Sequence, residues 1–229
     1  MIKHKCDSLI IGGTGQFGIT LKNQLIKKKK KKVVITTRYK KSNIRENKFH
    51  IVKLDVQNKR KIFKVIKDNK PKNIFYFASQ SSPSISFIKK KETLQANFNG
   101  CKNVLETIYK FNKDIKFFYA ASSEMYGRLK GKISLKSKKK PVNPYGKSKL
   151  KGFNITKTYR EKYKLKTYNL IFFNTESTLR DISFFIPKVC IAAINAKKNK
   201  TKTAFGNLNI KREWNWCEDQ CEILIKLMK

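Results

Sequence analysis

The chain has 229 residues and carries 54 Lys and Arg against 15 Asp and Glu, a formal net charge of +39. This length provides one well-packed domain and the start of a second, and no apolar run approaches the roughly 18 residues that a membrane span needs. We expect a cytoplasmic protein without a membrane segment or a signal peptide, because a glycine-rich stretch interrupts the only apolar run near the amino terminus.

The positive charge has two interpretations. A polyanion such as RNA binds a chain of this charge by releasing counterions. The excess, however, is mainly Lys accompanied by many Ile, Asn, Phe and Tyr, which an AT-rich coding sequence produces, and the cations are spread along the chain. No nucleic-acid-binding motif is visible, so we expect no specific nucleic-acid partner.

The five cysteines, at positions 6, 101, 190, 217 and 221, have neither disulfide-scaffold nor metal-ligand spacing. Cys217 and Cys221 simply stand one turn apart on an expected helix. We therefore expect reduced, mostly buried thiols and no metal ion.

The first elements predict a strand, a phosphate-binding loop and a helix. An apolar run at 8–11 precedes glycines at 12, 15 and 18, and the helical spacing of Ile19, Leu21, Leu25 and Ile26 follows. In such a loop the glycines allow a tight turn, close approach of backbone N–H groups to a pyrophosphate, and close packing of helix on strand. The stretch predicts an α/β, doubly wound, parallel-sheet Rossmann fold. We place the dinucleotide-binding domain at 1–172 and a partial, small substrate lobe at 173–229.

The residues at the end of the expected second strand, 33–37, indicate whether the cofactor is NAD or NADP. An Asp or Glu at this end holds the ribose 2′-hydroxyl of NAD. This chain instead has Arg38, Tyr39, Lys40 and Lys41, and a cation suits a 2′-phosphate. We predict NADP, with Arg38 as a contact; the alternative is that Arg38 is one more surface base.

Two further strands are expected before the middle of the chain. The run 50–56 ends near Asp55, which can reach an adenine or cap the helix 59–69, although Asn58 is also well placed for the cap. The apolar run 73–78 is typical of a strand buried on both faces. It leads into the small polar residues of 79–84, at the sheet edge where such folds bind ligands.

A long helix is expected over 92–112, followed by a strand at 115–121. Apolar residues at helical spacing form its buried stripe: Leu94, Phe98, Cys101, Val104, Leu105 and Ile108. We interpret Asn97 and Gly100 as packing residues. The strand delivers Ser122 and Glu124 to the same sheet edge.

Tyr145 and Lys149 share one face of a helix that begins at Asn143 and Pro144. An ammonium beside a phenol lowers the pKa of the phenol from about 10 towards neutrality. The pair therefore predicts a tyrosine that exchanges a proton with an alcohol, a prediction strengthened by the glycine loop and by Ser122 at the preceding strand end.

This order of motifs resembles the extended short-chain dehydrogenase/reductases that modify nucleotide sugars, and most closely the GDP-mannose 4,6-dehydratase family. The resemblance covers nearly the whole chain, from Leu9 to about Asp219. The motifs that carry it are Gly15-Gln16 with Gly18, Asn97 with Gly100, and the stretches 122–127, 145–149, 159–161, 173–177 and 206–214. The last of these is the reason for preferring GDP-mannose over other sugars.

The resemblance implies a lyase that converts GDP-mannose to GDP-4-dehydro-6-deoxymannose with recycled NADP. Tyr145 takes the proton of the 4-hydroxyl, Ser122 hydrogen-bonds that oxygen, and Lys149 holds the nicotinamide ribose. Glu124 removes the C5 proton and helps water leave from C6. The expected cofactor contacts are Gly12, Thr14, Gly15, Gln16, Phe17, Gly18, Arg38, Asp55, Val56, Ala78, Ser79, Tyr145, Lys149 and Arg180. The expected substrate contacts are Ser81, Ser123, Asn174, Lys188 and Arg212.

Several positions depart from the family pattern. Thr175 stands where His is common and Thr178 where Pro is common, Glu92 replaces an aromatic residue, and Pro187 replaces a basic one. Relatives also continue well past the Trp214 region. Two alternatives therefore stay open: another nucleotide-sugar epimerase or reductase of the superfamily, or a truncated Rossmann protein that binds without catalysis. We expect a homo-oligomer, because relatives associate.

Overall fold

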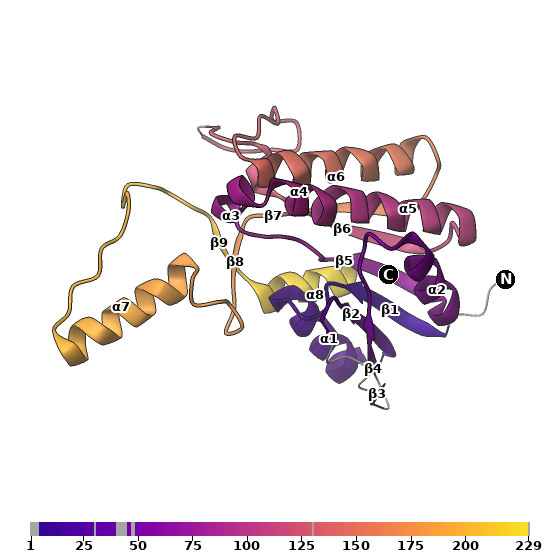
Figure 1. Ribbon diagram of the computed structural model, residues 1–229, viewed down its shortest axis with the longest axis horizontal. Coiled ribbons are helices and arrows are strands. Elements are labelled where there is room, and N and C mark those ends of the chain that lie inside the picture. Colours follow the sequence, from indigo (N-terminus) through magenta and orange to yellow (C-terminus); the bar gives the residue numbers. More distant parts are fainter. Residues whose placement is uncertain (1–4, 30, 40–44, 47–48, 130, 229) are drawn as a thin grey trace.

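The computed structural model describes residues 5–29, 31–39, 45–46, 49–129 and 131–228 (Figure 1). The main sheet contains β1 (Cys6–Ile11), β2 (Val33–Thr37), β3 (Arg45–Glu46), β4 (Phe49–Lys53), β5 (Pro71–Tyr76), β6 (Lys116–Ser122) and β7 (Thr167–Phe172). The strand order is β3-β4-β2-β1-β5-β6-β7. All neighbours pair in parallel except β3, which is antiparallel to β4. The predicted doubly wound parallel sheet is confirmed, and its order reverses between β1 and β5, where such folds bind ligands.

Helices cover both faces of the sheet. In Figure 1, α2 (Lys59–Asn69), α5 (Gly100–Phe111) and α6 (Pro144–Glu161) lie on one side, and α1 (Gln16–Lys29) and α8 (Cys217–Leu227) lie on the other. Alternate residues of β1 enter different cores: Leu9 and Ile11 join the cluster under α2 and α5, whereas Ile10 joins the cluster under α1 and α8. Burial on both faces explains why the central strands are continuous apolar runs.

The helix expected over 92–112 is one helical run with a π-helical turn. It consists of α4 (Lys90–Leu94), a π-helix at Gln95–Asn99, and α5, and it follows the short α3 (Pro83–Ile88). The expected stripe residues in α5 are fully buried, while Leu94 and Phe98 are half-buried. The widened turn places Asn97, whose Nδ2 donates to Ser148 Oγ at 2.9 Å, between the long helix and α6. Asn97 is therefore a packing residue, as predicted.

Two predicted strands end earlier than expected. The strand predicted at 50–56 stops at Lys53, and the one predicted at 73–78 stops at Tyr76. Asn58 caps α2 by accepting from Lys61 N at 2.8 Å. Asp55 instead closes a turn by accepting from Gln57 N at 2.9 Å. The apolar residues that follow each strand thus lie in loops over the core.

The carboxyl-terminal segment leaves the body of the molecule and returns to it. β8 (Asn174–Glu176) pairs in parallel with β9 (Trp214–Trp216), and α7 (Phe185–Asn199) projects outward between them (Figure 1). Helix α8 then packs on α1, where Gln24 Nε2 donates to the carbonyl of Glu218 at 2.9 Å. The division at residue 172 stays a prediction, but α8 belongs to the core of the Rossmann unit.

The cysteines are free thiols; Cys6, Cys101, Cys217 and Cys221 are buried and Cys190 is exposed.

Within the described ranges, no helix combines the length and apolar character needed to cross a membrane.

Candidate active site

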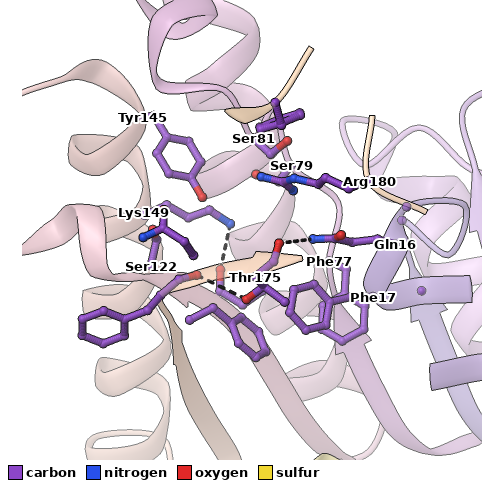
Figure 2. A pocket seen from close by; sticks show the side chains of 18 of the residues that line it. Gln16, Phe17, Phe77, Ser79, Ser81, Ser122, Tyr145, Lys149, Thr175 and Arg180 are labelled. Carbon is purple, nitrogen blue, oxygen red and sulfur yellow. Dashed lines mark hydrogen bonds between the residues drawn. The ribbon is translucent and has the colours of Figure 1, made fainter. Parts of the chain in front are cut away.

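A cavity of about 510 Å³ opens at the carboxyl-terminal edge of β1, β5, β6 and β7. It brings together fifteen of the residues named from the sequence: Gly12, Thr14, Gly15, Gln16, Phe17, Gly18, Ser79, Ser81, Ser122, Ser123, Glu124, Tyr145, Lys149, Asn174 and Arg180. Figure 2 shows Ser122, Tyr145 and Lys149 on one side of this cavity and Gln16, Phe17 and Phe77 on the other. The glycine loop and the polar strand ends therefore face one space.

Steric contacts require glycine at two of the three loop positions, Gly12 and Gly18, but not at Gly15. Gly12 has a φ of +83°, and a Cβ there would lie 2.4 Å from Ala78 N on the neighbouring loop. A Cβ on Gly18 would lie 2.5 Å from Gly13 Cα. At Gly15 the nearest atom is 3.8 Å away, so packing does not require glycine there. An open Gly15 beside the N-terminus of α1, whose first N–H groups have no partner within the helix, suits an approaching phosphate.

The side chain of Gln16 ties this loop to the segment after β7. Its Nε2 donates to the carbonyl of Thr175 at 3.2 Å, and its Oε1 accepts from Ser177 Oγ at 3.0 Å. Thr175, the position where the family pattern has His, donates through Oγ1 to Gln220 Oε1 at 2.8 Å. Gln16 thus positions one wall of the cavity through both ends of its amide.

Tyr145 and Lys149 lie in helix α6. The first turn of this helix is held in place by a cap from the neighbouring Asn143 and by a hydrogen bond to the distant Ser86. Asn143 Oδ1 accepts from Gly146 N at 2.7 Å, and Pro144 occupies the first turn, as the sequence predicts. The backbone N–H of Tyr145 donates to Ser86 Oγ in α3 at 3.1 Å. Both side chains are buried, and the hydroxyl of Tyr145 points towards the Lys149 side chain (Figure 2).

The prediction that Lys149 lowers the pKa of Tyr145 is wrong for this structure. Burial raises the pKa of Tyr145 to about 12, the charge of Glu124 adds to this, and a hydrogen bond with Ser122 and the charge of Arg180 oppose it. Burial also lowers the pKa of Lys149 to about 7. Lys149 Nζ donates to the carbonyl of Ala120 at 2.7 Å and lies 5.7 Å from the Tyr145 ring centroid. An amine with a pKa of about 7 is only about half protonated at pH 7, so it stabilises the phenolate of Tyr145 less than a permanent ammonium would.

Ser122 and Glu124 reach the cavity from the end of β6. Ser122 is its last residue, and its Oγ accepts from the backbone N–H of Glu124 at 3.2 Å, which starts the 3₁₀ turn Ser123–Met125. The carboxylate of Glu124 accepts from Asn143 Nδ2 through Oε2 at 2.7 Å. A hydroxyl, a carboxylate and a phenol therefore meet at one end of the cavity.

Arg180 supplies the cavity's guanidinium. Its Cζ lies 3.5 Å from the ring centroid of Phe184, and its Nε is 3.8 Å from Glu176 Oε2. Neither Arg180 Nε nor Glu176 Oε2 has a hydrogen-bond partner, although both atoms are buried. Desolvation lowers the pKa of Arg180 and raises that of Glu176. Arg180 nevertheless lines the cavity, so its guanidinium brings a positive charge to the wall that an entering anion would face.

Six predicted contact residues do not line this cavity: Arg38, Asp55, Val56, Ala78, Lys188 and Arg212. Arg38 and Asp55 are exposed beyond the ends of β2 and β4, Val56 is buried in the core, and Ala78 packs against Gly12. Lys188 Nζ lies 5.4 Å from the Phe205 ring centroid on the outward segment, and Arg212 Nη1 donates to the carbonyl of Lys211 at 3.0 Å. Lys40 and Lys41 lie outside the described residues.

The sequence reasoning missed the aromatic lining. Phe77 and Phe172, which follow β5 and end β7, pack on Phe17 with ring centroids 5.5 and 4.3 Å away. Phe173 and Phe184 also line the cavity. For Phe77, Phe172 and Phe173 the available signal was their place at strand ends on the ligand-binding edge; Phe184 precedes α7 and gave no such signal.

Comparison with known proteins points to one family. The family model described as GDP-mannose 4,6 dehydratase matches residues 9–229. The chain is similar to the GDP-mannose 4,6 dehydratase of Drosophila melanogaster, with 29% identity over 97% of this chain and 60% of that protein. It is also similar to the GDP-mannose 4,6-dehydratase of Sinorhizobium fredii (strain HH103), with 30% identity over 90% of this chain and 64% of that protein.

Among solved structures, the fold resembles the dTDP-glucose 4,6-dehydratase of Bacillus anthracis in complex with NAD. The TM-score is 0.84 at 22% identity, over 97% of this chain and 71% of that one. This similarity supports the Rossmann fold observed here.

Proposed function

Because this chain belongs to the GDP-mannose 4,6-dehydratase family, we propose that it is a nucleotide-sugar lyase that dehydrates GDP-mannose with a nicotinamide dinucleotide cofactor. The observation that carries the proposal is the convergence of Ser122, Glu124, Tyr145 and Lys149 on the cavity that the glycine loop borders. The chain spans 60 to 64% of the length of the two relatives, so its activity and its substrate are part of the proposal.

The residues present suit an anionic dinucleotide. Gly15 leaves space above the loop, Arg180 brings a positive charge to the cavity wall, and the first N–H groups of α1 border the same space. We propose NADP, because Arg38 is exposed just after β2, where an acidic residue would favour NAD. Asp55, Val56 and Ala78 are proposed to border the adenosine end. A bound nicotinamide supplies a hydride acceptor for C4 of the sugar and later the hydride donor for C6.

Tyr145 and Ser122 act on the 4-hydroxyl. As hydride leaves C4, the phenolate oxygen of Tyr145 takes the hydroxyl proton while Ser122 Oγ donates to the developing carbonyl oxygen. Burial opposes the phenolate, and Ser122 and Arg180 favour it by lowering the pKa of Tyr145. Lys149 is proposed to hold the nicotinamide ribose, from its place one helical turn after Tyr145.

Glu124 then acts on C5 and C6. The new 4-ketone acidifies the C5 proton. The Glu124 carboxylate would remove this proton and pass it to the C6 hydroxyl, which leaves as water, so that a double bond forms between C5 and C6. Return of the hydride to C6, and delivery to C5 of a proton equivalent to the one that Tyr145 took, would give GDP-4-dehydro-6-deoxymannose, with loss of water and no net oxidation. The presence of Glu124 in the same cavity as Tyr145 favours this reaction over an epimerisation, which needs no such acid/base group.

The sugar-nucleotide side of the site is less complete than the cofactor side. Ser81, Ser123 and Asn174 line the cavity and are proposed substrate contacts. Lys188 and Arg212 lie on the segment 173–229, which we propose as the partial substrate lobe; they would have to approach the cavity with the nucleotide. Assembly into a homo-oligomer is also proposed.

Two measurements on the full chain test the proposal. Calorimetric titration with NADPH and NADH, at a salt concentration that screens nonspecific attraction, should give saturable and tighter binding of NADPH. Incubation with GDP-mannose and catalytic NADP should give a product lighter by one water. Saturable NADPH binding without this product would overturn the dehydratase and leave a binding protein, whereas a 4-epimer would identify an epimerase.

A further inference from the structure

The side chain of Asn143 makes two hydrogen bonds that connect the start of α6 to Glu124. Asn143 is buried, its Oδ1 accepts from Gly146 N at 2.7 Å, and its Nδ2 donates to Glu124 Oε2 at 2.7 Å. The backbone N–H of Gly146 can only donate, which identifies the amide oxygen and leaves the NH₂ group for Glu124. We propose that Asn143 is a positioning residue that holds the Glu124 carboxylate for proton removal, an inference that rests on the proposed dehydratase function.

The surrounding backbone makes this connection rigid. A Cβ on Gly146 would lie 2.5 Å from the carbonyl oxygen of Glu124, so the first turn of α6 packs directly on the turn that carries the carboxylate. The other end of that turn is held by Ser122 Oγ, which accepts from Glu124 N at 3.2 Å. Glu124 is thus fixed from the strand by Ser122 and from the helix by Asn143, and the helix also presents Tyr145.

Capping alone does not explain an asparagine at this position. Ser, Asp and Asn cap helix N-termini about equally well, because each provides an oxygen for the first-turn N–H groups. Only Asn adds an NH₂ donor to that oxygen. The substitution Asn143→Ser would leave Glu124 without this donor, and Asn143→Asp would place a second carboxylate against it. The two functions of Asn143 can therefore be separated by mutation.

The test uses Asn143→Ser and Asn143→Asp, with Asn58→Ser as the matched control. Asn58 caps α2 in the same way, by accepting from Lys61 N at 2.8 Å, and it is not among the residues that line the cavity. The reaction is followed in single turnovers of the NADP-loaded full chain with GDP-mannose. Absorbance of the reduced nicotinamide rises when C4 is oxidised and falls when hydride returns to C6, so the two halves of the reaction are seen separately.

We expect both Asn143 variants to keep the rise and to slow the fall by about tenfold or more, because a hydrogen bond to a charged group is lost. Asn58→Ser should change neither phase. If the absorbance of Asn143→Ser falls as fast as that of the wild type, the proposed role of Asn143 is overturned, while the proposed function stands. A wild-type chain that gives no rise at all would overturn the proposed function, and the role of Asn143 in the reaction with it.

A second measurement needs no turnover. Asn143→Asp should lower the melting temperature at neutral pH more than Asn143→Ser does, because two carboxylates then face each other. Adding Glu124→Gln to Asn143→Asp should recover most of that loss, since the amide of the introduced glutamine can donate to the introduced carboxylate. Equal melting temperatures for the two single variants, or no recovery in the double variant, would contradict the contact.

Discussion

Lys149 Nζ donates a hydrogen bond to the backbone carbonyl of Ala120 at 2.7 Å, across the interface between α6 and β6. The Lys149 residue is only 3% exposed, and burial lowers the pKa of its amine from 10.5 to about 7. The carbonyl of Ala120 accepts from a neutral amine as well as from an ammonium. The residue is therefore fixed in place by the sheet, one helical turn after Tyr145, whichever form it takes.

The depressed pKa of Lys149 predicts a pH-dependent stability. Between about pH 7 and pH 10.5 the unfolded chain keeps a proton on this amine that the folded chain releases, so the free energy of unfolding should rise with pH in this window. Relative to Lys149→Met, the wild type should gain up to about 1.4 kcal/mol per pH unit. Urea unfolding of both proteins at several pH values below about 9.5 avoids tyrosine titration. Parallel stability curves would show that the lysine stays charged when folded.

The elements that the sequence predicted well are those whose signals are local. Asn58 and Asn143 cap α2 and α6 because a side-chain oxygen needs to reach only three residues along the chain. The return of α8 onto α1 was not predicted, since the contact of Gln24 with Glu218 joins residues 194 positions apart. The pKa of Tyr145 was predicted in the wrong direction because helix spacing brings Lys149 near but does not show burial, which raises the pKa of the phenol and lowers that of the amine.

Gly12 should tolerate alanine much less well than Gly131, although both have positive φ angles, +83° and +78°. The backbone cost of about 1–2 kcal/mol is common to both sites. At Gly12 the added Cβ also lies 2.4 Å from Ala78 N, whereas nothing lies within 4 Å at Gly131. Gly12→Ala should therefore lower the melting temperature further and abolish NADPH binding, with Gly131→Ala as the control. Equal destabilisation would mean that the loop can move away from Ala78.

Arg38→Asp should reverse the proposed cofactor preference. An aspartate after β2 accepts hydrogen bonds from the ribose hydroxyls of NAD and repels the 2′-phosphate of NADP. We expect NADPH affinity to fall by about tenfold or more and NADH affinity to be kept or to rise. Lys113→Asp changes the net charge equally at an exposed position before β6 and serves as the control. If both variants lose NADPH affinity to the same extent, overall charge and not Arg38 attracts the cofactor.

Glu124→Gln tests the assignment of the acid/base group. The amide keeps the size of the side chain but accepts no proton, so product formation should fall by about 10²–10⁴-fold, the contribution typical of general acid–base catalysis. NADPH affinity should be unchanged, because oxidation at C4 and cofactor binding use other residues. Glu106→Gln is the control: Glu106 pairs with Lys59 at 3.0 Å on the surface of α5, away from the cavity. Mass spectrometry of the sugar nucleotide and calorimetry of NADPH binding give the two readouts. Full turnover by Glu124→Gln would leave the carboxylate only its contact with Asn143, and the C5 proton would then have to pass to Tyr145, the other ionisable oxygen at that end of the cavity.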